Sequence, residues 1–414
     1  MPGIPSLAAP RVSVLPNGMR LFMLDGTGRD VARVSFVFRA GAVWQEKFFT
    51  ASATANLLSE GTRNMSAQEV AERLDFYGSY FEVNIDRDYS VVTFCSLTRF
   101  LPHTLAVAGE ILLRPAFPGN EVEIYRTKRR QSLTVERSKV SVQARELFAA
   151  TLFGPEHPYG VSAPAECYDD LGREDVERFY EARYRAGNCF VVCSGDFGEE
   201  NCRLVAELAG ALPSGGGGDL VLPPPQPQRS AFRERPGSLQ SAVRIGRLLF
   251  PRNHPDWVGM QVVSTLLGGY FGSRLVRNLR EEHGFTYGVF STMVNLDHAG
   301  YLAVGTEVGA EVTKRSVEEI YREIERLRRE RVGEEELAMV KNIMAGEVMR
   351  ILDGPFGIAD VTIEYIQNGM DNSCLADYVS RMRAVTSDDV LALADKYLAR
   401  DSFSTVIVGP GEVL

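Results

Sequence analysis

Apolar residues along the chain follow two different spacings, one that suits helices and one that suits strands. Residues 48–74 (FFTASATANLLSEGTRNMSAQEVAERL) predict a helix, a turn and a second, amphipathic helix. Residues 33–45 and 241–256 contain apolar runs that suit strands, and each run is followed by a helix. The presence of both element types predicts an α+β fold.

Two later segments share one layout, which indicates an internal duplication. Residues 171–198 and 384–411 each begin at an acidic helix N-cap, continue as an amphipathic helix that ends near a tyrosine, and close with an apolar strand and a glycine. Long helical runs also occur late in each half, at 121–154 and 334–369. We therefore expect two homologous α+β domains, each a sheet covered by helices.

The segment PSGGGGDLVLPPPQPQRS, residues 213–230, lies almost at the middle of the chain and combines four glycines with five prolines. Such a segment neither continues a helix nor joins a central strand. We expect it to be a linker between an N-terminal domain of residues 1–212 and a C-terminal domain of residues 231–414.

Composition narrows the classes of function. A net charge of −9 and a pI near 5.3 oppose a large phosphate-binding surface, so we expect no nucleic-acid partner. No apolar run approaches the roughly 20 residues that a membrane helix needs, so we expect no membrane partner. The six cysteines form no CxxC motif, and Cys189 and Cys193 suit the buried side of a strand. We expect a cytoplasmic protein; a removed signal peptide would make it periplasmic.

Several motifs give the chain a resemblance to a known family. They are LPNGMRLFMLD (15–25), LLSEGTRNMSAQEVAERLDFYGSYFEVNIDRDYS (57–90), LFGPEHPYG (152–160) and LLGGYFGSRLVRNLREEHGFTYGVFS (266–291). Over nearly its whole length the sequence resembles the pitrilysin-type, or inverzincin, zinc peptidases, within them the mitochondrial-processing-peptidase-like subgroup. The resemblance implies a clam-shell partner in a metallopeptidase-like dimer.

The resemblance also locates a lost zinc site. In active members an H-x-x-E-H motif lies on the helix before a Gly-Thr pair, which is residues 61–62 here. By position, the two zinc-binding histidines fall on Ser52 and Asn56, and the glutamate that activates water falls on Ala55. All three functional groups are absent, which indicates the scaffold of a metallopeptidase without its chemistry.

The family's third zinc ligand, a glutamate on a later helix, falls near Ser132 or Leu133, and the nearest acid is Glu136. Neither of the first two residues can bind zinc as a carboxylate would. No two of the chain's histidines are close enough in sequence to form a ligand pair on one helix. We expect no cofactor in this chain, and zinc only in a partner subunit. The histidines are His103, His157, His254, His283 and His298.

Two further pairs of residues can be compared with active relatives. One pair differs from the residues of active relatives, and the other pair matches them. Glu82 and Val83 stand where active members carry an Asn-Ala pair that lines the substrate cleft, so substrate contacts of the first half are expected to be lost. Arg280 and Tyr287, seven residues apart, match an Arg and a Tyr that in the family reach the substrate from the half without zinc.

The Arg and Tyr also have an ordinary structural interpretation. Arg280 could be an exposed helix residue that pairs with Glu281 or Glu282, on a helix capped by Gly284. Tyr287 could be a half-buried aromatic on the strand that FTYGVF predicts. The resemblance favours the functional interpretation, in which both groups donate hydrogen bonds to a developing oxyanion.

Three functions compete. The first is a non-catalytic subunit of a heterodimeric zinc peptidase, which supplies Arg280 and Tyr287 to a zinc-bearing partner of the same family and a peptide substrate; isolated chains could form a homodimer. The second is an inert peptide-binding or scaffold protein on the same fold, which has no need of the retained pair. The third, an independent peptidase, is opposed by the missing motif.

Overall fold

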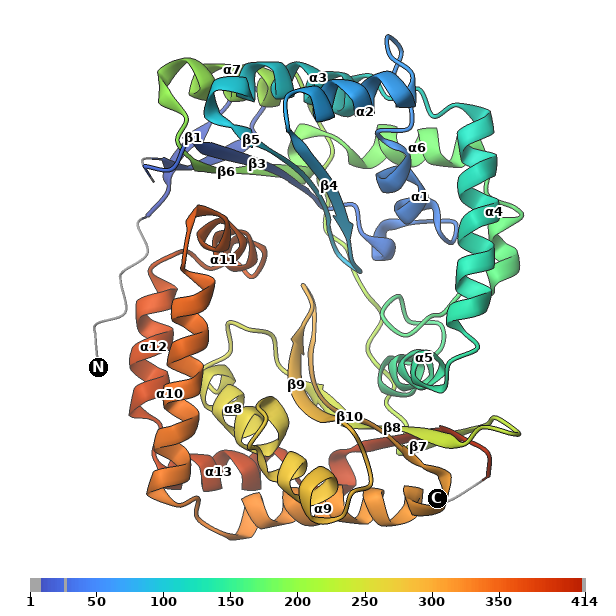
Figure 1. The fold of residues 1–414 in the computed structure, drawn as a ribbon, viewed down its shortest axis with the longest axis vertical. Coiled ribbons are helices and arrows are strands. Elements are labelled where there is room, and N and C mark those ends of the chain that lie inside the picture. The colour runs from blue at the N-terminus through green and yellow to red at the C-terminus, as the bar shows by residue number, and fades with distance from the viewer. Residues whose placement is uncertain (1–8, 26–27, 412–414) are drawn as a thin grey trace.

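The computed structural model describes residues 9–25 and 28–411, and it contains two separate sheets with helices around them (Figure 1). The first sheet has the strand order β1-β2-β6-β3-β5-β4 and the second has the order β7-β11-β8-β10-β9. The strands are β1 (Arg11–Val14), β2 (Arg20–Asp25), β3 (Val31–Phe38), β4 (Tyr80–Ile85), β5 (Ser90–Leu97), β6 (Cys189–Gly195), β7 (Ser230–Glu234), β8 (Gln240–Leu249), β9 (Val289–Asn295), β10 (Gly300–Gly309) and β11 (Ser404–Gly409).

Thirteen α-helices surround these sheets within the described part of the chain. In the first half they are α1 (Thr50–Leu57), α2 (Ala67–Phe76), α3 (Leu101–Leu113), α4 (Gly119–Glu136), α5 (Val140–Phe153), α6 (Arg173–Arg183) and α7 (Gly198–Gly210). In the second half they are α8 (Trp257–Ser264), α9 (Thr313–Arg329), α10 (Glu334–Ile351), α11 (Pro355–Gln367), α12 (Cys374–Ala384) and α13 (Ser387–Tyr397). Over the described ranges, none of the helices has both the length and the apolar character to cross a membrane.

The two sheets have the same topology, which confirms the predicted fold of two homologous α+β units. Apart from the edge strand β1, each sheet places its first, fifth, second, fourth and third strands side by side. In each, the first and fifth strands are parallel and all other neighbours are antiparallel. The repeated segments noted in the sequence form the matching pairs α6–β6 and α13–β11.

Local sequence explains why these matching helices begin where they do. The N-cap Thr386 and Asp389 of α13 satisfy each other's backbone N–H groups, at 3.1 and 2.8 Å. In the first half, the Asp175 carboxylate accepts from the backbone N–H of Gly172 at 2.9 Å. Strands β6 and β11 are buried at every position because helices cover both faces of each sheet.

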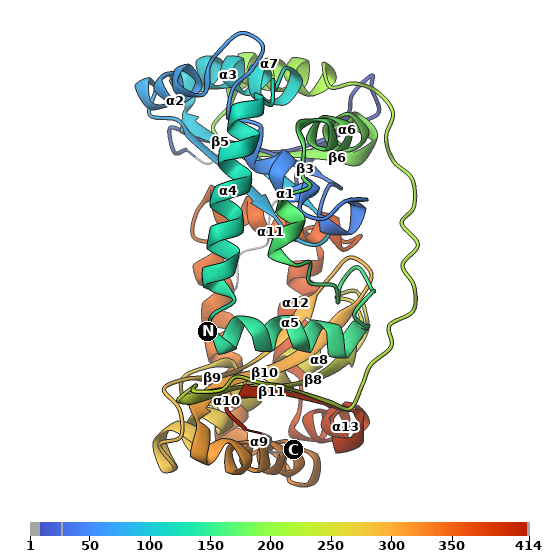
Figure 2. The same ribbon diagram turned by 90° about the vertical axis from the view of Figure 1, so that its right-hand side faces the viewer.

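Each sheet receives a helix from the opposite half of the sequence (Figures 1 and 2). Helix α11 packs on β6, where Ala359 and Ile363 meet an apolar cluster of the first sheet. Helix α5 packs on β8 and β11, and Phe148 lies so close to Gly246 that a Cβ there would be 2.6 Å from its ring. The two halves are therefore interlocked by exchanged helices.

Residues 213–229 contain no helix or strand, and part of this segment is attached to α5. The backbone N–H groups of Gln226 and Gln228 donate to the carbonyls of Phe153 and Thr151, at 3.0 and 2.8 Å. The proposed domain limits at 212 and 231 stay a prediction, since packing crosses them at α5 and α11.

A buried carboxylate joins the halves at the turns between β4 and β5 and between β9 and β10. Asp88 accepts from the Tyr159 hydroxyl at 2.6 Å and from the backbone N–H of Asp297 at 3.0 Å. The Tyr159 oxygen accepts in turn from the backbone N–H of His298 at 3.3 Å. Burial raises the pKa of Asp88, and burial together with the Asp88 carboxylate raises the pKa of Tyr159. Asp88 thus depends on these donors for its solvation.

Tyr159→Phe is expected to destabilise the protein by about 1–3 kcal/mol, because the buried Asp88 oxygen loses its shortest hydrogen bond. Urea denaturation followed by circular dichroism measures the change. Tyr80→Phe is the matched control, since Tyr80 is 57% exposed and its change should be within about 0.5 kcal/mol. Equal effects of the two substitutions would contradict the role given to Asp88.

Candidate functional site

The positions at which the resemblance places zinc ligands lie on α1, and none carries an imidazole or a carboxylate. Ser52 Oγ donates to the Phe49 carbonyl at 3.0 Å, and Asn56 Nδ2 donates to the Ser52 carbonyl at 2.7 Å. Both side chains are therefore engaged with the backbone of their own helix. Ala55 is fully buried, so its methyl group belongs to the core.

Aromatic side chains pack around these positions. Tyr168 stacks on Phe49 with ring centroids 3.9 Å apart, and Tyr125 of α4 meets Tyr168 edge-on at 6.5 Å. The buried Tyr125 hydroxyl lies beside Ser52 and Arg129, but no pair there has the geometry of a hydrogen bond. Burial raises the pKa of Tyr125 to about 12. An uncharged phenol thus occupies this environment.

Arg129 lies one helical turn beyond Tyr125, at the Tyr168 hydroxyl. A guanidinium at this place adds positive charge next to Tyr125, whose hydroxyl neighbours Ser52, and opposes a metal cation. Tyr125 and Arg129 were not predicted from the sequence as part of this site. Their spacing of four residues from each other, and of seven and three from Ser132, placed all three on one face of α4 and could have indicated them.

The proposed third-ligand positions also do not fit zinc. Ser132 and Leu133 are half-buried on α4, and Leu133 packs against the apolar core of the first half. Glu136, the last residue of the helix, is exposed. Within residues 9–25 and 28–411, no group of three His, Cys, Asp or Glu side chains could hold a metal ion. The residues present at the family's zinc position therefore do not fit the metal.

Glu82 and Val83, the positions of the family's cleft-lining pair, lie on the edge strand β4. Glu82 is exposed, and Asn84 Nδ2 reaches its carboxylate at 3.4 Å. Val83 is half-buried and packs against the apolar core of the first half. The strand thus keeps its position at the sheet edge while one of the two residues is turned to the interior.

Arg280 lies on a wide helical segment, Val276–Glu282, which has the π-helical hydrogen-bond pattern. Such segments are rare and are frequent at functional sites. Gly284 ends the segment with a φ of +63°, as the sequence predicted for a cap. The guanidinium is exposed and lies 4.6 Å from the ring centroid of Phe271, itself 67% exposed.

Arg280 is exposed on a helical segment, as the structural interpretation expects, although no ion pair joins it to Glu281 or Glu282 among the described residues. Hydrogen bonds to helix α9 hold this segment in place. Asn278 is buried and its Nδ2 donates to Glu319 and Glu323 of α9, at 3.1 and 2.9 Å. Buried hydrogen bonds to two carboxylates fix the backbone that carries the exposed arginine.

Tyr287 does not lie on a strand, contrary to the prediction from FTYGVF. The strand β9 begins two residues later, at Val289, because Thr286 holds the preceding residues in a turn. Thr286 Oγ1 lies 2.8 Å from the Glu307 carbonyl and accepts from the Gly288 N–H at 3.1 Å and from Thr306 Oγ1 at 3.0 Å. Tyr287 is 94% exposed, so the half-buried interpretation is also wrong.

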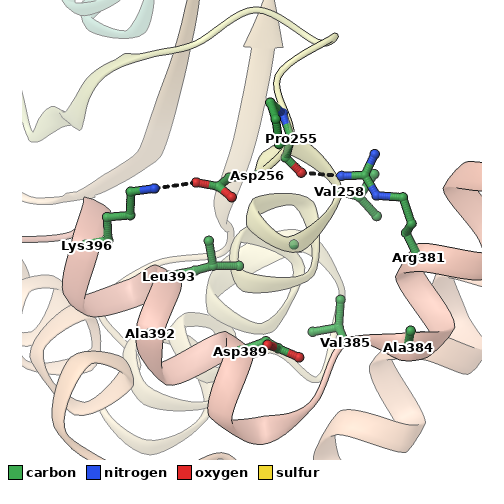
Figure 3. A pocket seen from close by; sticks show the side chains of 11 residues that line it. Pro255, Asp256, Val258, Arg381, Ala384, Val385, Asp389, Ala392, Leu393 and Lys396 are labelled. Atoms are coloured by element: carbon green, nitrogen blue, oxygen red, sulfur yellow. Dashed lines mark hydrogen bonds and ion pairs between the residues drawn. The ribbon is translucent and has the colours of Figure 1, made fainter.

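An open hollow of the second half lies elsewhere, between α8, α12 and α13 (Figure 3). Its volume is about 480 Å³. Asp256 on its wall already binds Lys396 at 2.7 Å and the Tyr397 hydroxyl at 2.6 Å, and Arg381 donates to the Pro255 carbonyl. Its polar groups are satisfied within the protein, so it offers no free group for chemistry.

Comparison with known proteins identifies a family and several proteins to which this chain is similar. Residues 170–344 match the family described as the Peptidase M16 inactive domain. An uncharacterized zinc protease of Streptomyces coelicolor is 23% identical over 380 residues, which cover 86% of this chain and 79% of that protein. The probable mitochondrial-processing peptidase subunit beta of Schizosaccharomyces pombe is 24% identical over 226 residues, 52% of this chain and 49% of that protein. The crystal structure of the peptidase M16 inactive domain from Pseudomonas fluorescens has the same fold, with a TM-score of 0.89 at 21% identity, and covers 97% of this chain and 98% of its own.

Proposed function

Because this chain belongs to the pitrilysin-type, or M16, family of zinc peptidases and carries no residues that fit zinc at the family position, we propose that it is the non-catalytic subunit of a heterodimeric zinc peptidase. The proposed partner is a subunit of the same family that bears H-x-x-E-H and the metal. The proposed substrate is a peptide held between the two subunits.

The observation that carries the proposal is the presentation of Tyr287. A tyrosine with 94% of its surface in water gains no burial energy, yet its loop is fixed by three contacts of Thr286. Arg280 is likewise exposed on a segment anchored by Asn278. A fixed backbone limits where these free donor groups can reach, which is one part of the preorganisation that stabilisation of an oxyanion requires.

We propose that Arg280 and Tyr287 donate hydrogen bonds to the oxygen of the scissile carbonyl as negative charge develops there. A guanidinium has several N–H donors and a phenol has one O–H donor, so each group can donate to a carbonyl oxygen. The partner supplies the metal and the general base, and this chain supplies the donors from the opposite side of the cleft.

The purified chain and its Asn56→His variant are both expected to bind no stoichiometric zinc. The added imidazole would be a single ligand, because Ser52 remains turned to the Phe49 carbonyl and Ser132 and Leu133 offer no carboxylate. Metal analysis after dialysis measures this, with a family member that bears H-x-x-E-H as the positive control. About one zinc per chain, with peptidase activity that a chelator abolishes, would contradict the non-catalytic assignment.

Co-purification tests the partnership itself. The chain is expected to form a 1:1 complex with a zinc-bearing family member of similar length, and only the complex should cleave an unstructured peptide. If the chain binds peptide or another complex but changes no cleavage by any zinc-bearing relative, the scaffold function stands instead.

A further inference from the structure

Two arginines and a phenylalanine form a basic surface on the inner face of the second sheet, beside the Tyr287 loop. We infer that this surface, formed by Arg145, Arg244 and Phe290, binds an acidic side chain of an extended peptide. The inference deepens the proposed function by naming the class of substrate, and it rests on that function only for the cleavage of the bound peptide.

The sheet itself creates the surface. Val406, Arg244, Gly305 and Phe290 are direct neighbours across β11, β8, β10 and β9, so their side chains share one face. Gly305 has no side chain, and the Arg244 guanidinium extends over it to within 5.4 Å of the Phe290 ring centroid. A Cβ at residue 305 would be 2.7 Å from Arg244 Nη1 and 2.4 Å from Phe290 Cζ. The glycine therefore makes room for the arginine and the ring to meet.

The Arg244 charge has no strong partner within the described chain. Its guanidinium donates to the neighbouring Val243 carbonyl at 3.1 Å, and no carboxylate lies within ion-pair distance. Burial lowers its pKa; the Glu307 carboxylate opposes this effect, and the Arg145 charge adds to it. A half-buried cation beside a like charge is stabilised by an anion that arrives from outside.

Arg145 on α5 extends this positive region. It is exposed on α5, which packs on β8 and β11, and its charge lowers the pKa of Arg244 on β8. The adjacent Glu146 cannot neutralise it, because that carboxylate accepts from Arg137 Nε at 2.9 and 3.2 Å. Arg145 and Arg244 thus form a positive region in which Glu307 is the acid that acts on Arg244.

Charge and shape together select an acidic peptide. A carboxylate can accept two hydrogen bonds from one guanidinium, and the aliphatic part of a glutamate side chain can lie on the 43% exposed Phe290 ring. Phe290 is the second residue of β9 and follows Tyr287 by three residues, so one peptide that runs along β9 can contact both Tyr287 and the Arg244–Phe290 pair.

Peptide binding to the isolated full-length chain tests the inference without any partner or cleavage. The probes are two fluorescein-labelled nine-residue peptides, one alternating glutamate and alanine and the other alternating glutamine and alanine. We expect the acidic peptide to bind at least ten times more tightly in fluorescence anisotropy, with an affinity that falls as salt rises. Equal binding of the two peptides would overturn the inference whatever the variants show.

The double variant Arg145→Gln/Arg244→Gln is expected to lose at least tenfold in affinity for the acidic peptide. Arg145→Lys/Arg244→Lys should recover part of the loss, since the charge returns without the planar pair of donors. The matched control is Arg99→Gln, whose guanidinium also lies over a phenylalanine, 4.8 Å from the Phe100 ring centroid, on the first half. Loss of binding in the control, or none in the double variant, would contradict the inference.

The outcomes separate this inference from the proposed function. Binding of the acidic peptide by a chain that stimulates no peptidase would leave the surface in place and remove the subunit role. A chain that completes a peptidase but binds the acidic and neutral peptides alike would keep the role of Arg280 and Tyr287 and remove the acidic specificity.

Discussion

Arg280→Ala or Tyr287→Phe is expected to lower kcat/KM of the peptidase complex by roughly ten- to a thousandfold. Each substitution removes a donor that is worth more in the transition state than in the bound substrate, because charge on the carbonyl oxygen appears only during the reaction. The measurement is initial-rate kinetics of the assembled complex on a fluorogenic peptide, with kcat and KM determined separately. A fall in kcat with a nearly constant KM would indicate loss of a contact specific to the transition state.

Stability and assembly provide the control for this experiment. Both side chains are exposed, so neither substitution removes core packing, and the free energy of unfolding should change by less than about 0.5 kcal/mol. Phe271→Ala is a useful comparison, since it leaves Arg280 in place and removes the ring beneath it. Full activity in a complex that carries both Arg280→Ala and Tyr287→Phe would exclude the action in trans and leave the scaffold function.

Phe148→Ala is expected to destabilise the chain by about 3–5 kcal/mol. Phe148 is 4% exposed and packs on Tyr301 with ring centroids 6.2 Å apart, over a gap that Gly246 leaves open. Its removal creates a cavity between α5 of the first half and the sheet of the second half. The glycine directly opposite has no side chain with which to fill the space.

The midpoint and slope of urea denaturation measure this effect, with Phe76→Ala as the matched control. Phe76 is also a helical phenylalanine but is 81% exposed, so its loss should cost little. A large loss for Phe148→Ala with one cooperative transition would show that the exchanged helices bind the halves into one unit. Two separate transitions in the native protein would show that the halves unfold independently and contradict this interlocking.

The sequence alone predicted the main features of the fold. Period-two and period-3.6 patterns identified the strands and helices, and the likeness of 171–198 to 384–411 predicted two copies of one unit, which the shared strand order confirms. These features are local, since each depends on residues within a few turns or one strand. The resemblance to the inverzincin family placed the ligand positions at Ser52, Ala55 and Asn56, and the residues found there include no histidine or carboxylate.

The tertiary structure decided what surrounds those positions. The sequence does not show that Tyr168, over 100 residues from Phe49, stacks upon it, or that Arg129 lies beside the former ligands. Nor did the alternation in FTYGVF show that Tyr287 lies in a turn, because Thr286 is held by Glu307 and Thr306 of another strand. Side-chain contacts between distant segments override the local pattern at these places.

The exchange of α5 and α11 and the meeting of Arg244 with Phe290 also depend on packing between elements. A helical pattern in the sequence indicates that one face of the helix is apolar, but it does not indicate which sheet that face will cover. The Pro/Gly-rich segment after residue 212 marked the middle of the sequence, yet buried contacts cross it because each inner sheet face is covered by a helix from the opposite half. The sequence by itself determined the helices and strands, their duplication and the missing zinc ligands. The tertiary structure determined how the two halves are joined, which donor groups are exposed and where the positive charge lies. These features follow from contacts between residues that are far apart in the chain.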